Sequence, residues 1–537
     1  MEGVISYTPH YDINGFRLLL VEIQNHHVLA RKGKGCRLLL YDNGSDNGSD
    51  NAISIGNKPY STVIIGPNGV GKSFVLSAIT DIFRHIKKLQ DGRGEMSDML
   101  DFRFAIEYVI NGHRYRISTL YDEETEKNTE RVFYHCWEDG IDVGMNRCAL
   151  PPAVLASSIT ISDRFRIQRQ ADGFYWYLGA RNENAPSTTG TKTIVRKTVT
   201  AIAECLAHDE YFKERLQELL NNLGLEPKME IEYSIRYRKV YLAEPITEEK
   251  FVSAFENWEK AFKEGGSKRK SAPWGQKKFS KISENSGNIT LIVRYLNKVT
   301  SEGRINGAGH VIYSLEDNNF VEDWKAIQLL SELDIFSYPK IRVYKKEQAN
   351  SEVQNFLFEQ SSSGETSMLC QFINILSRIE QHSLILIDEP ETSAHPNWQI
   401  HYIDWLNNIF KRFHTCHFVI ATHSHFILSD LEEGNSAIVA LDRDRGTGAI
   451  LNIAEGMNTY GWSTDDILYE VFRIRNKKNE ALERDLERAI QLLENKGEEQ
   501  EGEIDALLKR FNNVYRGDRD PLGKFIEELK KYAESES

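Results

Sequence analysis

The stretch VIIGPNGVGKSF, residues 63 to 74, follows an apolar run and leads directly into the helix-forming sequence VLSAITDIF. Glycines in such a turn leave room for backbone N–H groups to converge on a phosphate. Lys72 is placed to reach the β- and γ-phosphates of ATP, and the Ser73 hydroxyl is placed to ligate Mg²⁺. A glycine turn that matches by chance is disfavoured by the strand-to-helix setting. The residues assigned to this phosphate-binding loop are Gly66, Pro67, Asn68, Gly69, Val70, Gly71, Lys72 and Ser73.

Two later segments complete the site expected for phosphate chemistry. LILIDEP (384–390) reads as a buried strand whose carboxyl end delivers Asp388 to the magnesium ion and Glu389 to the water that attacks the γ-phosphate. VIATHS (419–424) ends a further strand in His423, which can donate a hydrogen bond to the γ-phosphate. Each segment alone is weak evidence, because a carboxylate pair or a histidine at a strand end often has only a structural role. Together with the phosphate-binding loop they predict an ATPase.

A third segment, FEQSSSGETSMLCQF (358–372), places hydroxyl groups and free backbone N–H groups at the start of an amphipathic helix. Such a helix end attracts anions through its partial positive charge. The segment therefore predicts a second phosphate contact, separate in sequence from the first.

Composition limits the classes of protein that fit. A chain of 537 residues is long enough for two or more domains. The six cysteines form no Cys-x-x-Cys pair, which disfavours a zinc site or a disulfide scaffold. The net charge of −13 argues against a surface that coats DNA, although a local basic patch stays compatible with it. No long apolar run or signal-like start is evident, so we expect a cytoplasmic protein that does not contact a membrane.

The pattern of elements predicts an α/β protein. The first third is rich in strands, with a hairpin signal at Asn111-Gly112. From about residue 365 the expected order is helix, strand (383–387), helix (398–413), strand (416–421), short helix and strand (436–441), which is typical of a parallel sheet. The expected organisation is an N-terminal half of an ATPase head, a mixed insertion, a C-terminal half of the head and a charged helical arm. These parts are assigned to residues 1–194, 195–350, 351–460 and 461–537.

GPNGVGKS, SSSGE, LILIDEPE and ATHS occur in the order seen in ABC-type ATPases, and the chain resembles the SMC and RecF-like branch of that family. The resemblance implies an ABC-type head, with a parallel sheet and an antiparallel β subdomain, that binds ATP and Mg²⁺. It also implies that the segment 361–365 contacts the γ-phosphate held by another subunit, so that a homodimer or higher oligomer forms composite sites. The residues implied in this contact are Ser362, Ser363, Gly364 and Glu365.

The chain departs from the family pattern in three places. Ser361 replaces the usual Leu and Ser363 the first Gly of the signature segment, SSSGE (361–365). The interval between residues 74 and 361 lacks sustained heptads, so we expect a compact α+β insertion in place of a coiled coil. The usual Q-loop glutamine is not evident after AVLASS (153–158), where Ser162 and Asp163 stand near its expected position.

Within the branch, YWYLGAR (175–181), DEPETSAHP (388–396) and YGWSTDDILYEVF (460–472) resemble the PtuA group of antiphage ATPases, found in Septu systems and in some retrons. That resemblance implies an ATPase that controls an associated HNH nuclease, PtuB. In a retron, a reverse transcriptase and its multicopy single-stranded DNA would join the complex.

Two further segments have competing interpretations. The arm places Leu482, Leu486, Ile490 and Leu493 at helical spacing, for packing within its own domain or for association with a partner. The basic segment 265–281 is either a solvated loop or a nucleic-acid contact, in which lysines and arginine neutralise phosphates and a tryptophan stacks on a base. The residues of that contact would be Lys268, Arg269, Lys270, Trp274, Lys277 and Lys278.

Two other functions compete with the antiphage role. One is a RecF- or SMC-like ATPase of DNA repair or chromosome maintenance. The other is a nuclease of the overcoming-lysogenisation-defect type, whose Toprim domain binds two metals. Asp442-Arg443-Asp444 matches part of that pattern, but a charged helical tail follows it.

Overall fold

The computed structural model describes residues 15–30, 35–41, 57–93, 100–120, 133–160, 162–167, 172–181, 191–236, 245–254, 256, 275–306, 309–346, 355–357, 363–432, 434–444, 450–452, 462, 466–467, 480–494, 501–514, 523, 525–527 and 529–531. The chain forms two compact units, Met1–Phe472 and Arg473–Ser537. No helix within these described ranges is both long and apolar enough to cross a bilayer.

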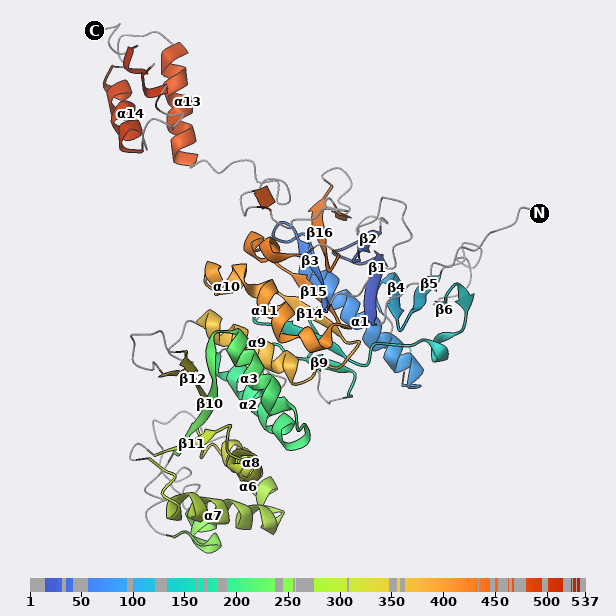
Figure 1. Ribbon diagram of the computed structural model, residues 1–537, viewed down its shortest axis with the longest axis vertical. Helices are drawn as coiled ribbons and strands as arrows, with labels where there is room; N and C mark the ends of the chain where they lie inside the picture. The colour runs from blue at the N-terminus through green and yellow to red at the C-terminus, as the bar shows by residue number, and fades with distance from the viewer. Residues whose placement is uncertain are drawn as a thin grey trace, which may run out of the picture. The chain divides into compact units, whose positions relative to one another are not determined.

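A seven-stranded sheet organises the first unit (Figure 1). Every neighbouring pair in it is parallel except β16–β17, so the predicted α/β class with a parallel sheet is confirmed. In spatial order the strands are β17 (Ile450–Asn452), β16 (Ser436–Arg443), β3 (Tyr60–Ile65), β15 (His417–Ala421), β14 (Leu384–Asp388), β8 (Val154–Ser158) and β9 (Tyr175–Tyr177).

The central strands are apolar on both faces because each face meets its own core. Along β14, Leu384 and Leu386 enter one hydrophobic cluster, whereas Ile385 and Ile387 enter the other. Side chains of a strand alternate between faces, so a continuous apolar run is what a strand covered on both sides requires.

The first core lies between the parallel sheet, helix α1 (Lys72–Gln90) and an antiparallel six-stranded sheet. Asn111 and Gly112 turn the β4–β5 hairpin with positive φ angles of 52° and 83°, as their sequence predicts. The strand order is β2 (Cys36–Leu39), β1 (Phe16–Gln24), β4 (Arg103–Ile110), β5 (His113–Leu120), β6 (Phe133–Glu138) and β7 (Ile141–Asp142). A short 3₁₀ turn, η3 (Met145–Arg147), follows.

His417 joins the two sheets. Its buried Nδ1 accepts a hydrogen bond from Leu18 N at 2.9 Å, and its Nε2 lies 2.8 Å from Thr62 Oγ1. Nδ1 must be unprotonated to accept that bond. Burial also lowers the pKa of His417 well below its usual value, so the ring is neutral.

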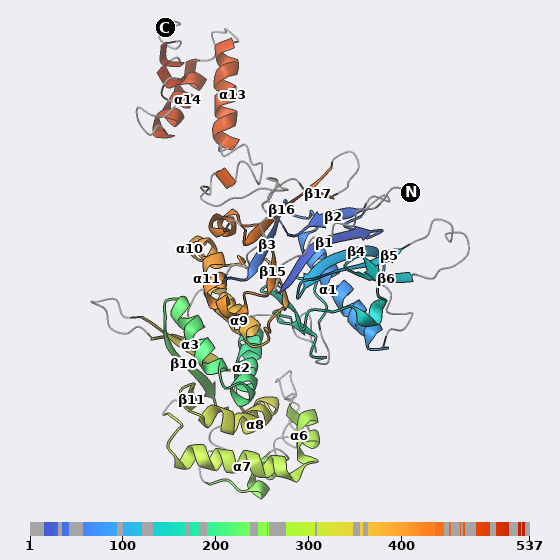
Figure 2. The same cartoon turned by 45° about the vertical axis from the view of Figure 1, so that its right-hand side comes forward.

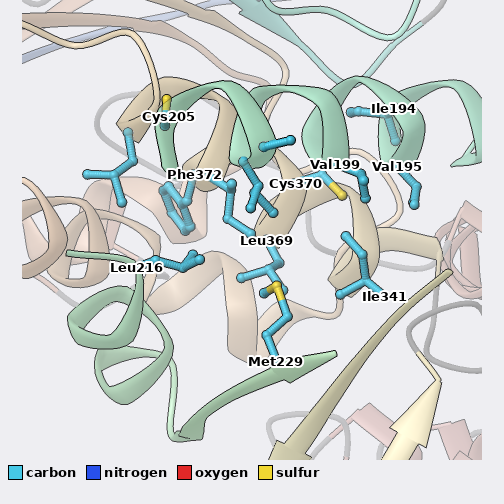
Figure 3. Close-up of a cluster of buried hydrophobic side chains, with 14 of the residues drawn as sticks. Ile194, Val195, Val199, Cys205, Leu216, Met229, Ile341, Leu369, Cys370 and Phe372 are labelled. Atoms are coloured by element: carbon cyan, nitrogen blue, oxygen red, sulfur yellow. The ribbon is translucent and has the colours of Figure 1, made fainter. Parts of the chain in front are cut away.

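The second core covers the opposite face of the parallel sheet. Helices α9 (Ser363–Leu376), α2 (Thr191–His208) and α3 (Phe212–Asn222) pack there. Figure 3 shows Val199 and Cys370 where α2 meets α9, with Met229 and Ile341 on the neighbouring strands. The same core continues into the insertion, so α9 is packed against the insertion as well as against the sheet.

The insertion is a compact α+β lobe, as predicted. Its buried Asp323 accepts hydrogen bonds from Lys298 and Arg304, each at 3.0 Å, and from Tyr313 at 3.2 Å, which satisfies the carboxylate away from water. An antiparallel sheet is formed by β11 (His310–Ser314), β10 (Leu225–Ser234), β12 (Lys340–Lys345) and β13 (Asn355–Leu357), and its helices are α6 (Gly275–Ser283), α7 (Ser286–Ser301) and α8 (Asn319–Glu332).

The second unit is helical, and α13 (Glu480–Glu494) and α14 (Glu501–Val514) lie side by side (Figure 2). They share a small core with a helical segment near residues 523–531. On the predicted apolar stripe, Leu486 packs against this core, whereas Ile490 is 45% exposed. The side chains of Leu482 and Leu493 lie outside the described residues. The stripe therefore packs within its own unit at Leu486, and only Ile490 among its described members faces solvent.

Three local predictions are wrong. The helix expected over 398–413 is divided into α10 (Pro396–Ile400), α11 (Tyr402–Ile409) and the 3₁₀ turn η5 (Lys411–Phe413), because the backbone leaves helical geometry at His401 (ψ 1°) and Phe410 (ψ 18°). Trp398 and Trp405 pack edge to face at 5.0 Å across the first break. The short helix after Ser424 is the 3₁₀ segment η6 (His425–Asp430). Residues 275–281 of the expected basic loop belong to α6, because Phe279 and Ile282 pack against the core at helical spacing.

Candidate nucleotide-binding site

The loops that follow β3, β14 and β15, which contain the predicted site residues, leave the parallel sheet at the carboxyl ends of these strands. Ile64 of β3 pairs with Ala421 of β15, and Ala421 pairs with Asp388 of β14. The carboxyl ends of adjacent parallel strands form the usual ligand site of such sheets. The phosphate-binding loop, the Asp388-Glu389 pair and His423 are therefore neighbours.

Two glycines of the phosphate-binding loop cannot carry a side chain. Gly66 has a φ of 150°, and a Cβ there would lie 2.4 Å from Leu441 O. Gly71 has a φ of 122°, and its Cβ would lie 2.8 Å from Leu29 Cδ2. The two glycines thus let the loop pack closely against Leu441 and Leu29 with backbone angles that other residues rarely adopt.

Lys72 is buried at the start of α1 and directed into this loop. Its Nζ donates to Gly66 O at 2.7 Å and to Pro67 O at 3.3 Å, and lies 3.1 Å from His423 Nδ1. Burial lowers the pKa of Lys72 to about 8, partly offset by nearby carboxylates that include Glu389. The cation is therefore held at the site in a poorly solvated setting, where attraction to phosphate is strong.

Ser73 and Asp388 offer two oxygen ligands for Mg²⁺. Ser73 Oγ donates to Asp388 Oδ1 at 2.9 Å, and burial raises the pKa of Asp388 to about 7. Across the described ranges no cluster of three or more His, Cys, Asp or Glu side chains is placed to hold a metal. A hydroxyl and one carboxylate still fit Mg²⁺, since this ion keeps waters and takes further oxygens from substrate phosphates.

Glu389 and His423 face each other across the site. Their nearest atoms, Glu389 Oε1 and His423 Nε2, are 3.6 Å apart. Burial and the neighbouring Lys72 lower the pKa of His423 to about 4, so the ring is neutral near pH 7. Glu389 has a φ of 49°, an uncommon backbone conformation for glutamate that typically persists where the surroundings fix it, as at active sites.

The signature segment is only partly described, because Ser361 and Ser362 lie outside the described residues. Ser363 begins α9, with Gly364 and Glu365 in its first turn. A Cβ at Gly364 would lie 2.0 Å from Ser393 O, so this glycine sits directly against the loop that follows Glu389. No local sequence pattern predicts this contact within one chain.

Of the predicted nucleic-acid contact residues, two lie within the part of the chain that the structure describes. Lys268, Arg269, Lys270 and Trp274 lie outside the described residues, whereas Lys277 and Lys278 belong to α6 of the insertion. Their role stays a prediction.

An aromatic cluster that the sequence does not predict lies beside the phosphate-binding loop. The His26 and His27 rings stack at 4.5 Å, and each meets Phe74 edge to face, at 5.8 and 5.5 Å. Phe102 lies 5.2 Å from His26, and the Arg164 guanidinium lies 5.0 Å from the Phe74 ring. Because these residues come from separate segments of the chain, no local sequence pattern predicts that they form a cluster.

Asp163, which stands near the expected Q-loop position, is engaged in a buried ion pair. It accepts hydrogen bonds from Arg181 Nη2 at 2.5 Å, Arg181 Nε at 3.0 Å and Tyr177 Oη at 2.8 Å. Arg181 O in turn accepts a bond from Lys197 Nζ of α2 at 2.7 Å. The Asp163–Arg181 ion pair thus fixes the segment that follows β8, the strand beside Asp388, and the Lys197 bond links this segment to helix α2 of the second core.

A family model described as "AAA ATPase domain" matches residues 49–428, which is most of the chain. The chain belongs to the AAA ATPase domain family. The match includes the phosphate-binding loop, the Asp388-Glu389 pair and His423, and membership of this family supports ATPase activity and ATP binding.

No curated protein gives a significant match. Among solved structures, the chain is similar to the SMC head domain from Thermotoga maritima, with a TM-score of 0.32 and 12% identity over 81% of this chain and 99% of that one. A Pyrococcus furiosus Smc head domain, bound to the C-terminal domain of ScpA, gives 0.29 and 12% over 82% and 96%. The recombination mediator protein RecF gives 0.29 and 12% over 83% and 100%.

Proposed function

We propose that this AAA ATPase domain protein binds ATP with Mg²⁺ at the edge formed by β3, β14 and β15, and hydrolyses it in the manner of ABC-type ATPases. The observation that carries the proposal is the meeting of three distant segments. Ser73 Oγ lies 2.9 Å from Asp388 Oδ1, and Lys72 Nζ lies 3.1 Å from His423 Nδ1.

Each side chain has a distinct role in the proposed reaction. Lys72 and the loop amides hold the phosphates, and Ser73 and Asp388 hold Mg²⁺, which when bound neutralises charge on the phosphate oxygens. Glu389 accepts a proton from the attacking water, and the neutral His423 donates a hydrogen bond toward the γ-phosphate. The test is equilibrium titration with ATP and Mg²⁺, followed by steady-state hydrolysis, on the full chain and on Lys72→Ala.

Two copies of the chain would complete the reaction site. In this proposal Ser362, Ser363, Gly364 and Glu365 of one copy contact the γ-phosphate held by Lys72 of the other. The N-terminus of α9 carries the partial positive charge of a helix end, which favours such a contact. Gly364 packs against Ser393, so the signature segment contacts the loop after Glu389 of its own chain.

The aromatic cluster beside the phosphate-binding loop is the proposed seat of the nucleobase. Phe74 directly follows Ser73, the His27 ring lies 5.5 Å from the Phe74 ring, and adenine stacks on flat aromatic faces of this kind. Phe74→Ala is expected to weaken ATP and ADP binding to the same degree.

The proposal for the biological role is an antiphage ATPase that controls an HNH nuclease of the PtuB type, with nucleic acid in the complex. Its support is the resemblance of 175–181, 388–396 and 460–472 to the PtuA group. In a retron setting the partners would include a reverse transcriptase and multicopy single-stranded DNA. The second unit, folded around its own core with Ile490 exposed, offers a separate surface for a partner.

Recovery of the tagged chain from its host, with mass spectrometry of bound proteins and sequencing of bound nucleic acid, tests this role. A small HNH protein in the eluate supports the antiphage proposal. Duplex DNA without such a protein favours the RecF- or SMC-like maintenance role instead.

The nuclease alternative is disfavoured by two observations. Arg443, between Asp442 and Asp444, donates to Val70 O of the phosphate-binding loop at 3.1 Å, so this strand end supports the ATP site. Among the described residues of 473–537 the structure contains helices and no strand, whereas a Toprim domain alternates the two.

A further inference from the structure

Two polar bridges connect the loop after β14 with the segment after β15. Glu391 Oε1 accepts a hydrogen bond from the backbone N–H of His423 at 2.6 Å. Gln399, on α10, donates from Nε2 to Ala394 O at 2.8 Å and accepts at Oε1 from Ser424 Oγ at 2.6 Å. His423 is thus held by one bond at its own backbone and by a second bond at the next residue.

We propose that Glu391 and Gln399 are positioning residues that hold His423 at the distance from Lys72 and Glu389 that the reaction needs. This inference rests on the proposed function. Neither side chain is assigned a contact with the nucleotide, so both act through His423.

The position of the His423 ring shows why these bridges matter. Its Nδ1 lies 3.1 Å from Lys72 Nζ, and its Nε2 lies 3.6 Å from Glu389 Oε1. The ring therefore lies between the phosphate-binding cation and the proposed base. A backbone shift of about 1 Å at this point is enough to lose a hydrogen bond to the γ-phosphate.

The Gln399 bridge also reaches the signature segment. Ala394 O is its acceptor, and the preceding residue, Ser393, lies against Gly364. The start of α9 is therefore linked to Ser424 by contacts through the Ser393–Ala394 backbone and the Gln399 side chain.

The chain contains a matched control at the opposite end of the same strands. Gln381, just before β14, donates from Nε2 to Arg412 O at 2.8 Å and accepts at Oε1 from Thr415 Oγ1. Both glutamines donate to one backbone carbonyl and accept from one hydroxyl, but Gln381 is exposed and lies at the end of the strands away from Lys72. Gln381→Ala thus removes the same two types of bond at a distance from His423.

The test compares Gln399→Ala, Glu391→Ala, Glu391→Gln and Gln381→Ala in the full chain. Dissociation constants for ATP and ADP with Mg²⁺, kcat, KM and Tm are measured for each. Because ADP lacks the γ-phosphate, the ratio of the ADP constant to the ATP constant reports the His423 contact. A general loss of stability does not move this ratio.

We expect Gln399→Ala and Glu391→Ala to lower this ratio about tenfold, the effect of one hydrogen bond to a charged group, and to lower kcat at least as much. Glu391→Gln should recover most of the ratio, since the amide oxygen can still accept from His423 N. Gln381→Ala should keep the ratio of the wild type.

A ratio that is unchanged in Gln399→Ala and Glu391→Ala, or that falls equally in Gln381→Ala, overturns the inference while leaving the ATPase proposal standing. Failure of the wild-type chain to bind ATP overturns the ATPase proposal itself. The two failures are therefore distinguishable in one set of titrations.

Discussion

A Cβ atom added at Gly364 would lie 2.0 Å from Ser393 O, 2.4 Å from Ser393 C and 2.7 Å from Ala394 N. Non-bonded contacts of a Cβ rarely fall below 3.0 Å, so Gly364→Ala must move the Ser393–Ala394 backbone by about 1 Å. Overpacking of this kind typically costs about 1–3 kcal/mol of stability. Glu389 lies on the same loop, and a 1 Å displacement of a reacting group can cost roughly a hundredfold in rate.

Gly287→Ala is the matched control, because Gly287 is also the second residue of a helix, α7. Its Cβ would meet only Asn285 Oδ1, at 3.2 Å. Alanine in a helix is favoured over glycine by roughly 0.5–1 kcal/mol, so this variant should keep or raise Tm. Steady-state ATP hydrolysis and thermal unfolding of both variants decide the matter. Normal kcat and Tm in Gly364→Ala would refute the packing argument.

Three further outcomes are expected. Lys72→Ala should lose measurable ATP binding in calorimetric titration, and unchanged affinity would remove the phosphate-binding loop from the site. Arg181→Ala leaves the Asp163 carboxylate buried without its cation, which should lower the free energy of unfolding by about 3–5 kcal/mol in chemical denaturation. Adding Asp163→Asn should recover part of that loss. Wild-type stability of Arg181→Ala would contradict the buried ion pair. Folding holds the pKa of His417 below its unfolded value of about 6.5. As the pH falls from 7 to 5, the unfolded chain therefore binds a proton at His417 that the folded chain does not bind, and Tm should fall. His417→Gln should make this decline shallower, and an equally steep decline would exclude His417 as its source.

Much of the site could be predicted because its chemistry is local in sequence. The phosphate-binding loop places a strand, three glycines, Lys72 and Ser73 in one short segment, and the apolar run before Asp388 identifies a buried strand. Parallel strands then bring their carboxyl ends together without further information. These features follow from short-range pattern and strand periodicity.

The features that were missed depend on contacts between distant segments. The His26–Phe74 pair, the Asp163–Arg181 ion pair and the contact of Gly364 with Ser393 each join residues that no periodic pattern relates. The broken helix after Pro396 is a similar case, because its break at His401 is marked by no proline or glycine in the sequence. The division into residues 1–194, 195–350, 351–460 and 461–537 stays a prediction.

Sedimentation of Glu389→Gln with ATP and Mg²⁺ tests the central claim most directly. Without its base the chain should bind ATP, fail to hydrolyse it and remain as a dimer closed by the signature segment of each copy. The mass of Glu389→Gln should double on adding ATP, and it should not change when Lys72→Ala is combined with Glu389→Gln. Normal hydrolysis by Glu389→Gln, or the same mass with and without ATP, would contradict it.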